Sequence, residues 1–287
     1  MISRIKKYLS PYYVNTILNK TNNFIRGSLG QNIFYLHIPK CGGTSLNKAL
    51  QSHYINWNIG ESSSLFNLDA SASWITTQKI TQQKLSSDEV DDSKVMQFRE
   101  ELLLYYMSQP HIKYISGHFA FSDLAYDHYA DKYVFLTVLR EPVERWISSY
   151  LYNRFRQPDK YRQINMSIEE YLQSDFGISQ GYEYAKFLGG ADKNGNFMTE
   201  EAVKRAKENL HKFHLIGFLD NLEAFKQQFK AKFGKELKMN VLNKRPENSP
   251  LEKAGSPIAN DLLKEQIRHI CQPDIEVYNY AIEHFKK

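Results

Sequence analysis

Four short apolar runs constrain the fold of this chain more than any other feature of its sequence. They are residues 32–37, 113–117, 133–139 and 213–218. Each has the length and composition of a strand buried in a parallel sheet. Helical patterns separate and follow them, at residues 44–51, 97–108, 143–156, 167–174, 199–210, 220–233 and 260–285, the last in two pieces around Pro273. This alternation predicts an α/β, P-loop-like, three-layer fold with a central, mostly parallel sheet flanked by helices.

The loops that follow the strands are where we expect chemistry. In open parallel sheets, ligands bind beyond the carboxyl ends of the strands. The loops after residues 37, 117 and 139 should therefore meet at one edge of the sheet. Residues 32–287 are predicted to form a single domain, with a polar insertion at 56–98 that stands outside the regular scaffold.

Residues 1–31 differ in charge from the rest of the chain. The net charge is +5, and this segment holds five of the 37 basic residues and no acid, which leaves 32 bases and 32 acids beyond it. A neutral body argues against a broad nucleic-acid-binding face. Apolar residues recur in 1–31 at helical spacing, so it is a basic amphipathic segment that either contacts an anionic membrane peripherally or docks on the domain itself.

The cysteine and hydropathy patterns indicate in which cellular compartment we expect the protein. Cys41 and Cys271 are the two cysteines, neither lies in a CxxC pair, and the histidines show no HxxxH spacing. We therefore expect neither a disulfide framework nor a metal site. No run of 18 apolar residues occurs, and the N-terminus lacks the pattern of a signal peptide. The expectation is a cytoplasmic protein, with the inner membrane as a site of peripheral contact; the pattern says nothing about oligomeric state.

The segment HIPKCGGTS, residues 37–45, has the layout of a phosphate-binding loop with one change. In the Walker A pattern GxxxxGK[ST] the lysine follows the glycines. Here Lys40 precedes them. Paired glycines expose backbone N–H groups, and the start of the next helix adds partial positive charge. A phosphate or sulfate group is the expected ligand, bound by Lys40, Gly42, Gly43, Thr44 and Ser45.

A second segment, LREPVERWISSYLY, begins where the run 133–139 ends. Arg140 emerges from the carboxyl end of that strand, and its planar guanidinium suits phosphate oxygens. Pro142 suits the first turn of a helix. Ser148 lies two turns further on, so it reaches the same anion only if the anion lies beside this helix. We interpret Arg145 as structural, paired with an acid such as Glu141.

A third segment places a histidine at the same edge. His118 follows a glycine just after the run 113–117, where an imidazole could accept a proton from a hydroxyl group. A packing role for His118 is the alternative. His37 immediately precedes the anion loop, and we interpret it as a support that bonds to the backbone.

These three segments, in this order, resemble the sulfotransferases that use 3′-phosphoadenosine-5′-phosphosulfate (PAPS), and above all the carbohydrate branch of heparan and chondroitin O-sulfotransferases. The likeness spans about residues 32–250. The family's first motif, approximately PKxGGTS, binds the 5′-phosphosulfate, which implies this role for Lys40 through Ser45, with Cys41 at a variable position. The second motif, R-[DE]-P-x-x-R-x-x-S-x-[YF], binds the 3′-phosphate, which implies that role for Arg140 and Ser148.

The resemblance also carries weaker assignments. A histidine serves as the catalytic base in the 2-O-sulfotransferase members, which implies this role for His118. A late loop closes over the donor in the family, which implies that residues 243–257, with Lys244 and Arg245, cover it here. Residues 56–98 and 153–200 are then expected to shape the acceptor site.

The resemblance implies sulfuryl transfer from PAPS to a hydroxyl group of a glycan or glycolipid, with adenosine 3′,5′-bisphosphate (PAP) as the product. Lys40 would meet the leaving oxygen, and His118 would take the proton of the acceptor hydroxyl. The alternative is a P-loop-like nucleotide-binding protein or kinase. A kinase should carry a lysine directly before Thr44 and an acidic residue at a later strand end. This chain has Gly43 and Arg140 in those places.

Overall fold

A computed structural model describes residues 29–54, 63–81, 92–155, 163–190, 195–239 and 261–286 of the chain. Nearly all of the amphipathic segment 1–31 and the whole of the loop 243–257 lie outside these ranges. The expectations for them, including the donor contacts of Lys244 and Arg245, stay predictions.

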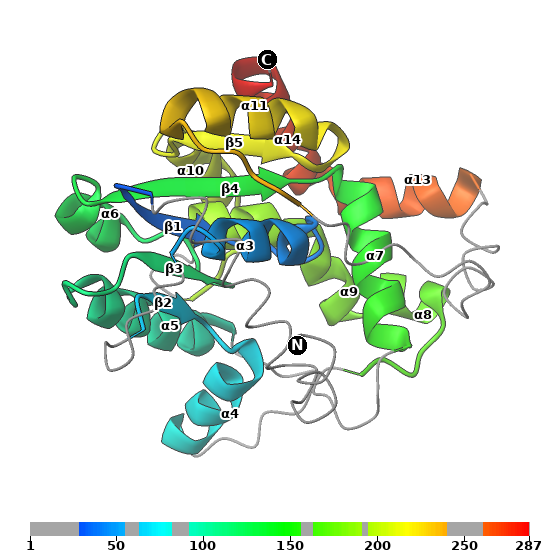
Figure 1. Cartoon of the computed structure of the whole chain (residues 1–287). Coiled ribbons are helices and arrows are strands. Elements are labelled where there is room, and N and C mark those ends of the chain that lie inside the picture. Colours follow the sequence, from blue (N-terminus) through cyan, green and yellow to red (C-terminus); the bar gives the residue numbers. More distant parts are fainter. Residues whose placement is uncertain are drawn as a thin grey trace, which may run out of the picture.

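A five-stranded sheet forms the centre of the molecule (Figure 1). Its strands are β1 (Asn32–Leu36), β2 (Leu65–Asn67), β3 (Tyr114–Gly117), β4 (Tyr133–Leu139) and β5 (Leu215–Phe218). They lie in the order β2-β3-β1-β4-β5, and every neighbouring pair is parallel. The α/β class and the four predicted strands are confirmed.

Helices cover both faces of the sheet, which makes three layers (Figure 1). One face is covered by α3 (Gly43–Gln51) and α11 (Leu222–Phe233). The other is covered by α5 (Asp92–Met107), α6 (Asp123–Tyr129), α10 (Glu200–Leu210), α14 (Gln272–Phe285) and a π-helical turn, η2 (Ala185–Gly189). The remaining helices are α4 (Ala70–Thr81), α7 (Pro142–Arg154), α8 (Ile168–Gln173), α9 (Asp175–Ser179), α13 (Asp261–Ile270) and the 3₁₀ turns η1 (Gln180–Tyr182) and η3 (Leu219–Asn221).

Side-chain alternation along the strands explains why the two layers are needed. In β1, Phe34 and Leu36 belong to the core under α5 and η2, whereas Ile33 and Tyr35 belong to the core under α3 and α11. All four are fully buried. Because neighbouring strand residues point to opposite faces, a strand that is apolar throughout requires cover on both sides.

A third apolar cluster lies beyond the carboxyl ends of the strands. It joins α7, α8 and α13, and Trp146 is its largest side chain, with its indole N–H donating to Gly177 O at 2.8 Å. This cluster anchors α7, the helix that follows Arg140. In Figure 1, β4 points toward α7, so the helix lies where the sheet presents its loops.

The interpretation of residues 56–98 as an insertion outside the scaffold needs correction. Within it, β2 pairs with β3 as the edge strand, α4 follows, and α5 begins at Asp92 rather than at 97. The sequence did not reveal these elements because β2 has only three residues and is half-buried, while α4 is largely polar. An edge strand needs no continuous apolar run, because it is neither paired nor covered on every side.

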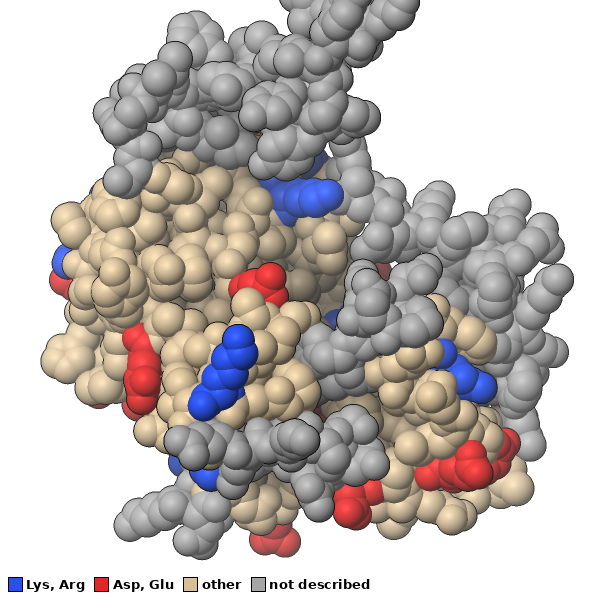
Figure 2. Space-filling model, turned by 90° about the horizontal axis from the view of Figure 1, so that it is seen from below, with Lys and Arg blue, Asp and Glu red and all other residues tan. Residues whose placement is uncertain are grey.

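Across the described ranges, no helix combines the length and apolarity that crossing a membrane requires. On the face shown in Figure 2, basic and acidic side chains lie scattered among uncharged ones.

Candidate active site

The ends of three adjacent strands meet at one level. Leu36 of β1 pairs with Gly117 of β3 on one side and with Thr137 of β4 on the other. His37 continues this ladder, since its N–H donates to Gly117 O at 3.0 Å. The loops that carry Lys40, His118 and Arg140 therefore leave the same edge of the sheet, as the strand pattern predicts.

The loop between β1 and α3 has an unusual backbone. Lys40 has a φ of 67°, and it is the one non-glycine residue with positive φ among those described; Gly42 follows with a φ of 73°. A left-handed conformation costs a lysine about 1–2 kcal/mol. Strain of this kind gathers at ligand-binding sites, where the surrounding structure enforces it. Here Arg140 Nη1 donates to the carbonyl oxygen of Lys40 at 3.3 Å.

A cavity of about 640 Å³ opens over this loop. Its size falls in the range of small-molecule sites. It is lined by His37, Lys40, Gly42, Gly43, Thr44, Ser45, Arg140, Glu144, Ser148, Leu151, Tyr152, Leu219, Leu222 and Met239. The cavity therefore brings together residues that the sequence analysis assigns to anion binding, including Ser148 of α7.

The two cations of the cavity have different surroundings. The ammonium of Lys40 lies 3.8 Å from the centroid of the Tyr152 ring, a cation–π contact on the cavity wall. The Arg140 guanidinium lies 3.4 Å from Glu144, and the Arg140 backbone N–H donates to the Tyr184 hydroxyl at 2.8 Å. Arg140 is therefore held at the strand end through both its side chain and its backbone.

His37 and His118 form a pair of neighbouring imidazoles. Their ring centroids lie 4.7 Å apart, and His118 Nδ1 lies 2.6 Å from the carbonyl oxygen of His37. A carbonyl oxygen only accepts, so Nδ1 carries the hydrogen and Nε2 of His118 is left with the lone pair. The prediction that His37 is a support bonded to the backbone stays a prediction; the contact seen here is made by the His37 carbonyl oxygen, which holds the His118 ring.

The ring of His37 also shapes the loop. Burial holds the pKa of His37 well below its usual value, and the nearby His118 and Lys40 lower it further. The imidazole is therefore neutral at physiological pH. A methyl group added at Gly43 would lie 2.0 Å from His37 Nε2, so glycine is required there for space. Of this pair, His37 is among the residues that line the cavity, and His118 is not.

Cys41 does not face the cavity. Its thiol is fully buried and lies 3.7 Å from the Tyr184 hydroxyl, and burial raises its pKa to about 11. Only the backbone of Cys41 is placed to meet a ligand. Among the described residues, no three of the His, Cys, Asp and Glu side chains gather as metal ligands would.

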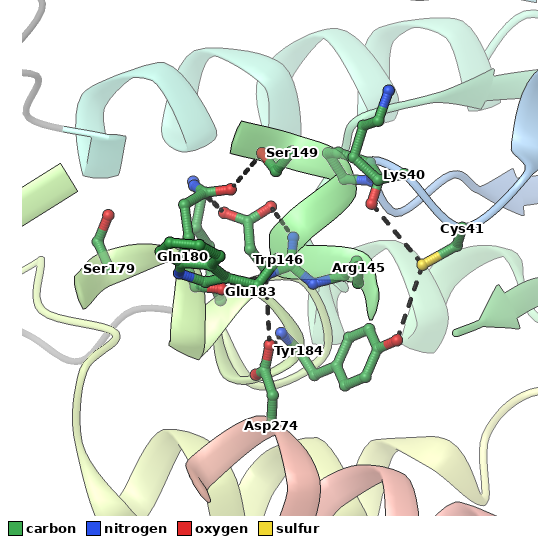
Figure 3. Close-up of polar contacts among 12 residues, drawn as sticks. Lys40, Cys41, Arg145, Trp146, Ser149, Ser179, Gln180, Glu183, Tyr184 and Asp274 are labelled. Carbon is green, nitrogen blue, oxygen red and sulfur yellow. Dashed lines mark hydrogen bonds and ion pairs between the residues drawn. The ribbon is translucent and has the colours of Figure 1, made fainter. Parts of the chain in front are cut away.

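Arg145 is structural, but its partners are not those expected. Its fully buried guanidinium lies 3.9 Å from Glu183 and 3.8 Å from Asp274, and it donates to the carbonyl oxygen of Gln180 (Figure 3). Glu141 instead caps α7, where its carboxylate accepts from the N–H of Glu144 at 2.8 Å. Gln180 belongs to η1, Glu183 directly follows η1, and Asp274 belongs to α14, so only the tertiary fold brings these partners to α7.

This buried network continues to the cavity wall through Tyr184. Asp274 Oδ1 accepts from the backbone N–H of Tyr184 at 2.7 Å, and the Tyr184 hydroxyl holds both backbone groups of Arg140. Figure 3 shows the chain of contacts from Asp274 through Tyr184 to Cys41. Nothing in the sequence around Tyr184 signals this role, because its partners lie 44 and 90 residues away along the chain.

The Asp274 carboxyl should make stability depend on pH. Burial raises its pKa to about 8, and the neighbouring Arg145 opposes that rise. Because the folded-state pKa lies above the unfolded value of 3.8, the contribution of Asp274 to the free energy of unfolding is full below that pH. It is lost progressively as the pH rises to about 8. We expect Asp274→Asn to remove this loss. Denaturant unfolding at about pH 6 and about pH 9 measures the free energy of unfolding, which should decline less between these pH values in Asp274→Asn than in the native protein. Equal declines in the two proteins would contradict the raised pKa of Asp274.

Comparison with known proteins shows the family to which the chain belongs. A model of the sulfotransferase family matches residues 28–281, so the chain belongs to that family. The match runs through the anion loop, His118, Arg140 and the helices behind them.

One curated relative is heparan sulfate 2-O-sulfotransferase 1 of Mus musculus. The two chains are 25% identical over 187 residues, which cover 59% of this chain and 52% of the relative. This chain therefore matches about half the length of that relative.

Proposed function

We propose that this protein transfers a sulfuryl group from PAPS to a hydroxyl group of a carbohydrate acceptor, a glycan or a glycolipid, with His118 as the general base. Membership of the sulfotransferase family supports the reaction class. The observation that carries the proposal is the single cavity wall on which Lys40, the N-terminus of α3, Arg140 and Ser148 meet.

The cavity fits a nucleotide that carries phosphates at two positions. The loop of Gly42–Ser45 would hold the phosphosulfate through backbone N–H groups and hydroxyls, while Arg140 and Ser148 would hold the 3′-phosphate. Leu219, Leu222 and Met239 add an apolar surface that suits a purine ring. The Arg140 guanidinium lies 3.4 Å from Glu144, so a bound 3′-phosphate would compete with this carboxylate for the cation.

His118 acts on the acceptor hydroxyl in this reaction, and Lys40 acts on the leaving group. As the acceptor oxygen bonds to sulfur, its proton passes to Nε2 of His118, the nitrogen that the hydrogen bond of Nδ1 leaves as acceptor. The S–O bond to the 5′-phosphate breaks, and the Lys40 ammonium balances the charge that gathers on the leaving oxygen. His37 is a neighbour of both groups, and because it is neutral it adds no competing charge.

The acceptor class rests on the comparisons. The mouse relative is named for heparan sulfate, a polysaccharide, which supports a carbohydrate acceptor here. A panel of heparan sulfate, chondroitin and a neutral glucan, each incubated with sulfur-35-labelled PAPS, tests this part. Label in at least one polysaccharide is the expected result, and label in none of them would count against the acceptor class.

Arg140→Ala tests the donor site directly. Loss of hydrogen bonds between charged groups costs about 1.5–3 kcal/mol, so we expect PAP to bind roughly 10- to 100-fold more weakly. Isothermal calorimetry with PAP gives this affinity, and ATP in place of PAP tests the kinase alternative.

Glu144→Gln provides a matched control for this experiment. It removes the ion-pair partner of Arg140 without touching the cation, so PAP affinity should hold or rise slightly. Unchanged PAP binding in Arg140→Ala, or tight binding of ATP and none of PAP by the native protein, would overturn the donor assignment.

A further inference from the structure

We propose that Arg99 of α5 is a positioning residue that fixes the catalytic base to the start of α4. The inference rests on the proposed function, because it takes His118 as the base. Nothing in the sequence singles out Arg99, which lies in a helix of mixed polarity and outside the family's phosphate motifs.

Arg99 is a buried arginine whose guanidinium donates to two separate segments. Only 5% of the residue is exposed. Its Nη1 donates to the carbonyl oxygen of His118 at 2.8 Å. Its Nε donates to the Ser73 hydroxyl at 3.0 Å, and its Nη2 donates to the carbonyl oxygen of Ala70 at 3.2 Å. Three neutral oxygens, from two separate segments, therefore share one charged fork.

Burying a guanidinium is costly, so the group needs several hydrogen bonds at once. The geometry points to a clamp. One edge of the fork holds the backbone of the base, and the other holds the first turn of α4. Movement of either segment would leave a buried charge with fewer partners.

Other contacts bring the same two segments together. The N–H of Leu68 donates to Ser116 O at 2.8 Å, and a methyl group at Gly117 would lie 2.4 Å from Cβ of Leu68. The chain just before α4 is thus packed directly against the residue that precedes His118. Arg99 adds hydrogen bonds between the same two segments, because it joins the carbonyl oxygen of His118, the residue after Gly117, to the first turn of α4.

The position of His118 depends on two backbone anchors. His37 O receives the Nδ1 hydrogen and sets the orientation of the ring. Arg99 holds the His118 carbonyl on the opposite side of the residue and so sets where the Cα lies. A shift of about 1 Å in a reacting group can lower a rate by about 100-fold.

The test compares Arg99→Met with Arg99→Lys. We expect Arg99→Met to lower kcat by about 10- to 100-fold while the KM for PAPS stays within about 2-fold. Arg99→Lys can still donate to one or two of the three oxygens, so part of the lost kcat should return. Circular dichroism and calorimetry with PAP establish for each variant that the fold and the donor site persist.

Two milder variants on α4 keep the test decisive if Arg99 variants fold poorly. Ser73→Ala removes one acceptor of the fork, and we expect a kcat loss of a few-fold. Thr77→Val is the matched control: its buried hydroxyl, one turn further along α4, donates to Ser73 O and forms no hydrogen bond with Arg99. Its kcat should stay at the native value.

A double-mutant cycle separates this proposal from the proposed function. If Arg99 acts through the base, Arg99→Met should cost no more than about 2-fold in a His118→Asn background, with residual rates read from sulfur-35-labelled PAPS. An equal loss in both backgrounds, or a native kcat in Arg99→Met and Ser73→Ala, would overturn the positioning role. Full activity of His118→Asn alone would instead overturn the base assignment.

Discussion

Lys40→Met should lose about 100- to 1000-fold in kcat while the fold and PAP binding largely persist. The ammonium stands at the mouth of the loop, on the cavity wall, where it would meet the leaving oxygen of the transfer. A charge that develops only in the transition state is stabilised only there, so the loss should fall on kcat rather than on ground-state affinity. Met keeps the length of the side chain and places the same demand on the left-handed backbone.

Labelled-sulfate transfer measures kcat for this variant, and calorimetry with PAP measures binding. Lys48→Met is the control, because Lys48 is an exposed residue of α3, the helix that follows the loop of Lys40, and does not line the cavity. A Lys40→Met protein with native kcat would refute the leaving-group role. A loss confined to PAP affinity would make Lys40 a binding residue instead.

His118→Asn should lower kcat by about 100- to 10,000-fold, the range that general-base catalysis supplies. The amide of Asn can replace Nδ1 as the donor to His37 O, but it offers no basic nitrogen in place of Nε2. The substitution therefore keeps the local hydrogen bond and removes the chemistry. PAP affinity should be unchanged, since His118 does not line the donor cavity.

The same assay with His111→Asn serves as the control for that experiment. His111 is exposed and precedes β3, at the end of the strand away from the cavity. Native activity is expected for it. If His118→Asn also keeps native activity, the base is another group, and His37, the imidazole that lines the cavity, becomes the next candidate to substitute.

Strand positions and the tight turn between β1 and α3 could be read from the sequence because each depends on local pattern. The run Tyr133–Leu139 is buried at every position and forms β4. Pro142 opens α7, and Gly42 and Lys40 make the tight turn before α3. Parallel strands place their carboxyl ends together, so the meeting of these loops followed from chain order alone.

Contacts between distant segments could not be read in this way. Arg145 selects Glu183 and Asp274 rather than the nearby Glu141, because α7 turns that face of the helix toward η1 and α14. Arg99 of α5 bonds to the carbonyl oxygen of His118, which lies 19 residues further along the chain. These choices depend on which side chains are buried together, and that is decided only when the layers pack.

By itself, the sequence determined the α/β class, the parallel strands and the anion loop with Lys40 ahead of its glycines. Local propensity and strand order control those features. Only the tertiary structure decided that Tyr152 meets Lys40, that Tyr184 holds Arg140, and that β2 and α4 belong to the scaffold. The reason is physical: a buried polar group must find a partner, and the partner is whichever residue the packed layers bring within reach.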